Sequence, residues 1–89
     1  MELKYILGEN GNFAIFSKAN THSEMARGFY GKPVSAGFCQ INIVEDREYM
    51  TSIVKHTLHV ECYGESISLH LKSRNEDSEI ITRGINSIY

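Results

Sequence analysis

The chain is short of several residue types, and each shortage excludes a class of protein. A single proline in 89 residues, together with 10% aromatic residues, argues against a disordered chain. Two cysteines, Cys39 and Cys62, are too few for a disulfide scaffold, so we expect free thiols in a reducing cytoplasm. No apolar run approaches the roughly 18 residues of a membrane-spanning helix. The opening residues are also too polar for a signal peptide, so no membrane association is expected.

The charge is small and dispersed. Nine basic and eleven acidic residues give a net charge of −2, and the basic residues are scattered along the chain. A nucleic-acid-binding protein usually carries a basic stripe, so the sequence argues against that class. With 42% hydrophobic and 22% charged residues, the composition is that of a soluble globular protein. The length predicts one domain over residues 1–89, close to the lower limit for a self-sufficient core.

The segment Lys55–Lys72 separates polar and apolar side chains most cleanly. It predicts a β-hairpin with Gly64-Glu65 at its tip, because glycine first in a two-residue loop suits a type II′ turn. A slip of one residue would destroy the separation of the faces, which favours this register. The predicted polar pairs are Tyr63 with Ser66, Glu61 with Ser68, His59 with His70 and Thr57 with Lys72; the apolar pairs are Cys62 with Ile67, Val60 with Leu69 and Leu58 with Leu71.

A second hairpin is predicted near the N-terminus. Residues 3–7 and 13–16 read as strands, and Asn10-Gly11 is typical of a two-residue type I′ turn. The expected cross-strand pairs are Ile6 with Ile15 and Tyr5 with Phe16, on opposite faces. Since both faces carry large apolar groups, one of them must meet a second layer or another chain. This suggests a homodimer, and the intramolecular alternative is that the 44–54 segment covers the second face.

Two capping-box patterns predict helices. Residues 21–24 (THSE) begin a short helix over about 21–30, and residues 73–76 (SRNE) begin an amphipathic helix that runs to about Asn86. Residues 34–43 read as a strand with a β-bulge near Gly37, and 49–54 as a further strand.

The fold class predicted from these segments is α+β. We expect an antiparallel sheet of four to five strands with two helices packed on one face, in the order ββα-ββ(β)-α.

The histidines and cysteines do not predict a metal site. His56, His59 and Cys62 follow one another at intervals of three residues, and residues three apart on a strand point to opposite faces. His59 therefore cannot join His56 and Cys62 in the converging set of ligands that a zinc site needs. The predicted register does place His59 opposite His70, where the rings could share a metal or titrate together, or simply be solvated. Cys62 falls in the apolar row, which predicts a buried and unreactive thiol.

The best candidate ligand site is Lys72, Ser73 and Arg74, where the last predicted strand leads into the second helix. Free amides and two cations there could hold a phosphate or carboxylate. The competing interpretation is that Ser73 and Glu76 already satisfy those amides as a capping box.

Two function classes follow from these features. The first is a small non-enzymatic binding or interaction module without a cofactor, whose partner is another protein or a second copy of the chain. The alternative is an anion-binding domain or enzyme that uses Lys72 and Arg74 at a helix N-terminus, with His59 or His70 as acid–base groups.

Overall fold

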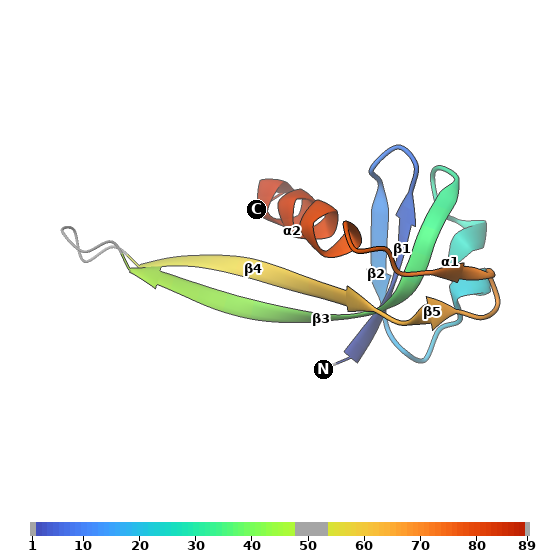
Figure 1. Cartoon of the computed structure of the whole chain (residues 1–89), viewed down its shortest axis with the longest axis horizontal. Helices are drawn as coiled ribbons and strands as arrows, with labels where there is room; N and C mark the ends of the chain where they lie inside the picture. Colours follow the sequence, from blue (N-terminus) through green and yellow to red (C-terminus); the bar gives the residue numbers. More distant parts are fainter. Residues whose placement is uncertain (1, 48–53, 89) are drawn as a thin grey trace.

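The computed structural model describes residues 2–47 and 54–88. Four strands form an antiparallel sheet in the order β2-β1-β3-β4, and two short strands form a second sheet (Figure 1). The predicted α+β class is thereby confirmed. The elements are β1 (Glu2–Gly8), β2 (Phe13–Phe16), α1 (His22–Arg27), β3 (Pro33–Arg47), β4 (Val54–Tyr63), β5 (Glu65–Ser66), β6 (Leu71–Lys72) and α2 (Asp77–Ile88).

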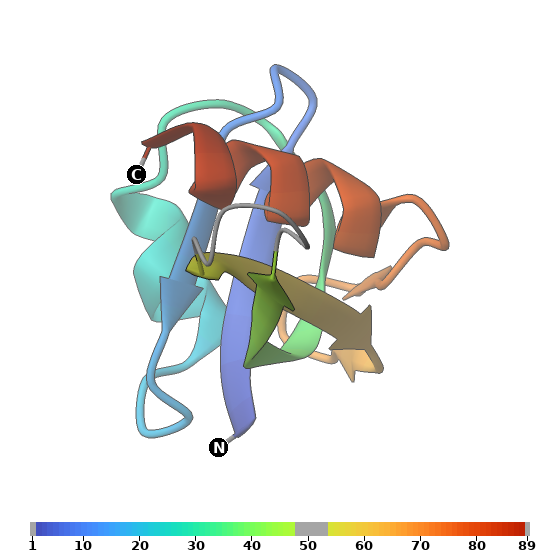
Figure 2. The same cartoon turned by 90° about the vertical axis from the view of Figure 1, so that its left-hand side faces the viewer.

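The two helices lie on opposite faces of the large sheet, which corrects the expectation that they share one face. Tyr5 and Leu7 of β1 are buried in a cluster with Ile81 of α2. Ile6, between them, is buried in a second cluster that includes Phe29, just after α1. Successive strand residues point to opposite faces, and both faces of β1 are apolar, so each needs its own layer. Figure 2 shows α2 crossing in front of β1 and β2, with α1 behind.

The predicted hairpin over residues 55–72 is wrong. β4 pairs along its length with β3, which places His59 opposite Asn42 rather than His70. β5 pairs with β6, and Gly64, at a φ of 76°, separates β4 from β5 instead of forming a hairpin tip. The alternation of side chains was read correctly in β4, where Val60 is buried under α2, but not beyond Gly64, where Ile67 is exposed and Ser66 is buried. The partner differs because β3 can pair with β4 over ten residues, whereas the local hairpin offers fewer backbone hydrogen bonds.

The register of the first hairpin also differs by one residue from the prediction. Tyr5 lies opposite Ile15, and Ile6 lies opposite Ala14. The amide of Gly8 donates to the carbonyl of Asn12 at 2.8 Å, which leaves a three-residue loop. The third loop residue, Gly11, has a φ of 84°, as such loops require.

The corrected register sorts the apolar side chains of the first hairpin by face. Tyr5, Leu7 and Ile15 contribute to the cluster beneath α2, and Ile6 and Phe16 to the cluster beneath α1. Both faces are therefore covered within one chain. The first hairpin no longer provides a reason for dimerisation.

One of the two predicted helix N-caps is confirmed. The Thr21 hydroxyl accepts from the amide of Glu24 at 3.2 Å, and α1 then ends at Arg27, three residues earlier than predicted. The predicted helix start at Ser73 is wrong, because α2 begins at Asp77. Neither helix of the described chain is long and apolar enough to cross a membrane.

The register of β1 against β3 shifts between Leu7 and Gly8, opposite Pro33–Ser35, so the bulge is not at Gly37. Gly37 instead permits a close approach, since a Cβ there would lie 2.5 Å from the carbonyl oxygen of Tyr63. Most of the predicted 49–54 strand lies outside the described residues, and β4 begins at Val54.

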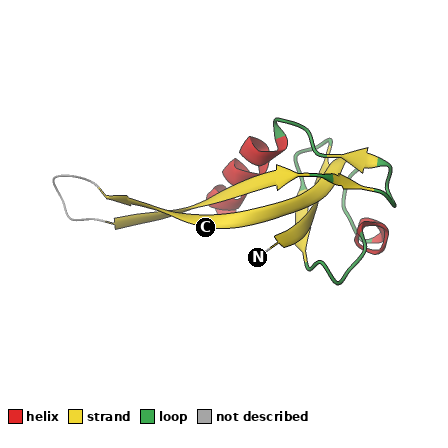
Figure 3. Ribbon diagram, turned by 60° about the horizontal axis from the view of Figure 1, so that its bottom comes forward, coloured by secondary structure: helices red, strands yellow, loops and turns green. Residues whose placement is uncertain are grey.

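β3 and β4 continue together beyond the body of the molecule. We call residues 41–47 and 54–60 the arm, because β1 stops pairing with β3 at Gln40. The arm gives the molecule a long axis of 49 Å, against 25 and 22 Å for the others. Figure 3 shows the two strands running past α2 as a ribbon.

The outer edge of β4 is hydrogen-bonded to side chains of α2. Residues at every fourth position of the helix reach successive outward-facing backbone groups of the strand. Asn86 accepts from the Leu58 amide at 3.0 Å and donates to its carbonyl at 2.8 Å; Thr82 accepts from the Val60 amide at 3.0 Å and donates to its carbonyl at 3.2 Å; and Ser78 accepts from the Cys62 amide at 2.9 Å. The helix thus takes the place of a fifth strand along this edge.

Candidate functional site

The opposite edge of the arm, on β3, has no strand beside it in residues 2–47 and 54–88. Pairing with β1 ends where Glu2 meets Gln40. The Cys62 amide points outward to α2, so the pair that Cys62 makes with Cys39 is of the non-hydrogen-bonded type. Alternation along β3 then directs the backbone groups of Ile41 and Ile43 away from β4. These groups are the kind that another strand can pair with.

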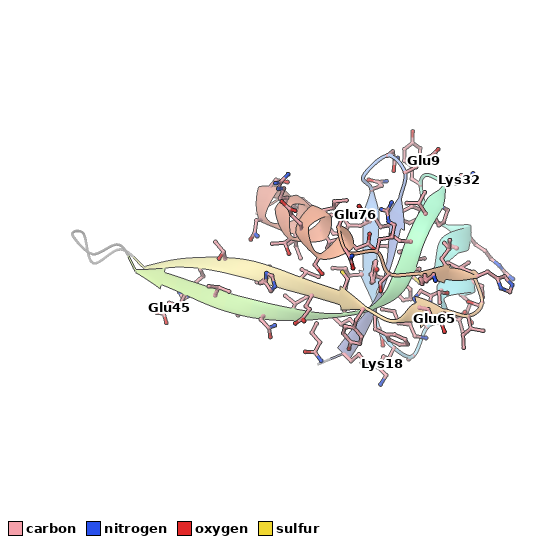
Figure 4. The ribbon with its side chains drawn as sticks, in the orientation of Figure 1. Glu9, Lys18, Lys32, Glu45, Glu65 and Glu76 are labelled. Carbon is pink, nitrogen blue, oxygen red and sulfur yellow. The ribbon has the colours of Figure 1, made fainter. Side chains whose placement is uncertain are left out.

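The arm also exposes apolar side chains. Ile43 is 71% exposed and Val44 is 47% exposed, and as sequence neighbours they lie on opposite faces of the ribbon. Glu45 follows them on the same strand, well away from the labelled charges of the body (Figure 4). The edge and the two side chains together make the arm the main candidate interaction surface.

The predicted ligand site forms only in part. The Ser73 amide donates to the carbonyl of Gly64 at 2.9 Å. The guanidinium of Arg74 lies 3.1 Å from the buried carboxylate of Asp77 and 3.3 Å from that of Glu76. Since two carboxylates already face Arg74, its charge is balanced within the chain. Lys72 is exposed at the end of β6.

The two predicted histidines are separated. His59 is exposed on β4 opposite Asn42. His70 ends the turn between β5 and β6, with a φ of 54°. His70 and Lys72 border one surface hollow of about 340 Å³ with Glu65, and His59 is not part of its wall. The arrangement thus brings together one histidine and one cation of the predicted set.

A buried polar network was missed by the sequence analysis. Asp77 is fully buried and accepts from the Tyr5 hydroxyl at 2.5 Å and from the Arg74 amide at 3.0 Å. Burial, and then the hydrogen bond to Asp77, raise the pKa of Tyr5. These bonds tie the start of α2 to β1, and a charge without such partners could not be buried there.

Both thiols are in a setting that makes the thiolate scarce at neutral pH. Cys39 is buried and Cys62 half-buried, and neither is in a disulfide. Burial raises the pKa of Cys39 to about 11. Burial is also the main cause of the higher pKa of Cys62, about 12.

In the described chain no three His, Cys, Asp or Glu side chains converge to hold a metal ion.

Another hollow, of about 490 Å³, lies between the start of α1 and the β5–β6 turn. His22 lies in its wall, with Nε2 2.8 Å from the carbonyl oxygen of Gly37 and its ring edge-on to Phe16 and Phe38. Burial lowers the pKa of His22, so the ring is held neutral as part of the core. Its position in the capping box gave no sign of this role.

Comparison with known proteins found no match among protein-family models, curated proteins or solved structures.

Proposed function

We propose that the chain is a non-enzymatic interaction module that binds an extended segment of a partner protein along the β3 edge of the arm. The observation that carries the proposal is the edge beyond Gln40, where β3 pairs, among the described residues, only with β4. A two-stranded ribbon is marginally stable in water, and a third strand would add backbone hydrogen bonds on its open side. Exposed Ile43 and Val44 would supply side-chain contacts on the two faces.

The remaining chemistry supports binding rather than catalysis. The pKa values of both thiols are raised, which disfavours the reactive thiolate. The guanidinium of Arg74 already faces two carboxylates, which weakens the anion-binding alternative. A reducing cytoplasm suits a chain whose two cysteines are free.

A second copy of the chain is the first partner to consider. The open stretch of β3 spans residues 41–47, and its midpoint is Val44. Antiparallel pairing of two copies about Val44 would use the whole stretch without reaching Gln40, where β1 is already paired. Val44 would then face its own copy in a non-hydrogen-bonded pair, with Cα atoms about 4.5 Å apart.

Two cysteine variants test this arrangement. Val44→Cys should form a disulfide-linked dimer under mild oxidation, because the expected Cα separation lies within the range for disulfides. Thr57→Cys is the matched control, since Thr57 lies opposite Val44 on β4 but one strand farther from the axis. Peptide mapping would identify the link, and sedimentation equilibrium of the wild type should show a mass that rises with concentration.

A partner other than a second copy is tested by amide chemical shifts. An extended peptide of alternating threonine and valine should shift the amides of Ile41 and Ile43 and saturate. A constant monomer mass up to millimolar protein, with no shifts in the arm, would refute the proposed function. Saturable shifts with inorganic phosphate at residues 70–74 would instead favour the anion-binding alternative.

A further inference from the structure

Cys39 and Cys62 lie directly opposite each other on β3 and β4. Their pair is non-hydrogen-bonded, because the Cys62 amide donates outward to Ser78 at 2.9 Å. Both side chains are on the face beneath α2, where Cys39 is buried and Cys62 packs against the same cluster. In such pairs the Cα atoms are about 4.5 Å apart, at the short end of the range found in disulfides.

We infer that Cys39 and Cys62 form a dithiol site that a low-molecular-weight disulfide, such as oxidised glutathione, converts to an intrachain disulfide. In the first step the Cys62 thiolate attacks the glutathione disulfide, forms a mixed disulfide and releases one glutathione thiolate, which takes up the proton lost by Cys62. In the second step the Cys39 thiolate attacks the Cys62 sulfur and releases the second glutathione. The chain loses two electrons and two protons, and the oxidant becomes two thiols.

The order of attack follows from exposure. Cys62 is half-buried and can meet a soluble oxidant, whereas Cys39 is fully buried and can meet only Cys62. Burial raises the pKa of both thiols, so the reaction is slow at neutral pH and accelerates as the pH rises.

The bond would join β3 to β4 at the root of the arm. Cys39 and Cys62 lie just on the body side of residues 41 and 60, so the disulfide closes a loop that contains the whole arm. If the arm binds a partner as proposed above, oxidation would fix the separation of the two strands that carry the binding edge. The formation of the disulfide does not itself depend on that function.

The test is to incubate the native chain with glutathione buffers of rising oxidised fraction, then quench with acid and map the peptides by mass. The expected product is a monomer that has lost two hydrogens, with residues 39 and 62 in one cross-linked species. In the oxidised chain, amide exchange in β3 and β4 that proceeds through unfolding should slow by roughly three-hundredfold, from the entropy of closing a loop of about 24 residues.

Two variants serve as controls. Cys39→Ala should stop at a glutathione adduct on Cys62, and Cys62→Ala should remain unmodified because Cys39 is buried. Amide spectra establish that each variant is folded, and the wild-type mass result needs no variant.

A wild-type chain that yields only the Cys62 adduct, only intermolecular disulfides, or no product until it unfolds would overturn the inference. Each of these results leaves the cross-linking test at Val44 unaffected. The dithiol site and the proposed function can therefore fail separately.

Discussion

Replacing Thr82 by valine tests whether α2 acts as a substitute strand. The Thr82 hydroxyl is the side-chain partner of both the amide and the carbonyl of Val60. Val60 is completely buried, so water cannot take over these hydrogen bonds. Valine has the shape of threonine and a similar helix propensity, so the change removes the hydroxyl with little other effect on the helix.

The expected loss follows from the two backbone groups left without a partner. An unsatisfied buried group costs about 1–3 kcal/mol, so two cost about 2–6 kcal/mol. The added methyl of valine recovers about 1 kcal/mol by burial, and the carbonyl can tolerate a missing partner better than the amide. We therefore expect Thr82→Val to lower the free energy of unfolding by about 2 kcal/mol.

Thr82→Ser is the matched control, because it keeps the hydroxyl and removes only a methyl. Urea titrations of the wild type and both variants at neutral pH give the comparison. The serine variant should be the more stable of the two, and the denaturant m-value should be unchanged. If the valine variant were as stable as the serine variant, the hydrogen bonds from α2 to the edge of β4 would contribute nothing.

Three further predictions concern other parts of the fold. Thr21→Ala should lower the free energy of unfolding by about 1 kcal/mol, because the Thr21 hydroxyl caps α1. Ser73→Ala should change it by less than about 0.5 kcal/mol, because α2 begins only at Asp77. Equal losses for the two variants in denaturant titrations would contradict the observed start of α2. The pKa of Tyr5 is raised in the folded chain, so the contribution of Tyr5 to stability is complete below its ordinary pKa of 10.0 and decreases as the pH rises beyond that value. Melting temperatures measured from pH 8 to 11 should therefore fall less steeply for Tyr5→Phe than for the wild type. Parallel curves would refute this prediction. Gly84→Ala should destabilise the chain despite the better helix propensity of alanine, since the new Cβ would lie 2.5 Å from the ring of Phe13; a rise in melting temperature would show that the ring can move aside.

The sequence predicted most of the strands but not how they pair, and residues 67–70 of the hairpin predicted over residues 55–72 form a turn instead of a strand. Alternation placed Val60 on the apolar face, and that side chain is buried. The alternation in β4 does not decide whether its partner is the neighbouring segment 65–72 or the distant β3. Both segments carry apolar residues at alternating positions that could face those of β4. The position of the N-terminal hairpin was predictable, but its register was not, because Asn10-Gly11 occurs in loops of two and of three residues.

The candidate site was predictable only where it depends on local pattern. Tyr5 and Asp77 are 72 positions apart, and no periodicity links them. The polar stripe of α2 did leave a signal, because Ser78, Thr82 and Asn86 recur every four residues. A polar stripe on a helix normally indicates a solvent-facing side, so its contact with β4 required the three-dimensional arrangement.

The stripe on α2 has a geometric limit that bears on the arm. Four residues of helix rise about 6.0 Å, and two residues of strand rise about 6.8 Å, so helix and strand positions stay nearly in step over a few contacts. Each step of four residues also rotates the side chain by about 40° around the helix axis. A fourth contact would be turned by about 120° from the first, and the strand would have to coil around the helix to meet it. A longer helix of the same spacing would therefore leave the outer part of the arm uncovered.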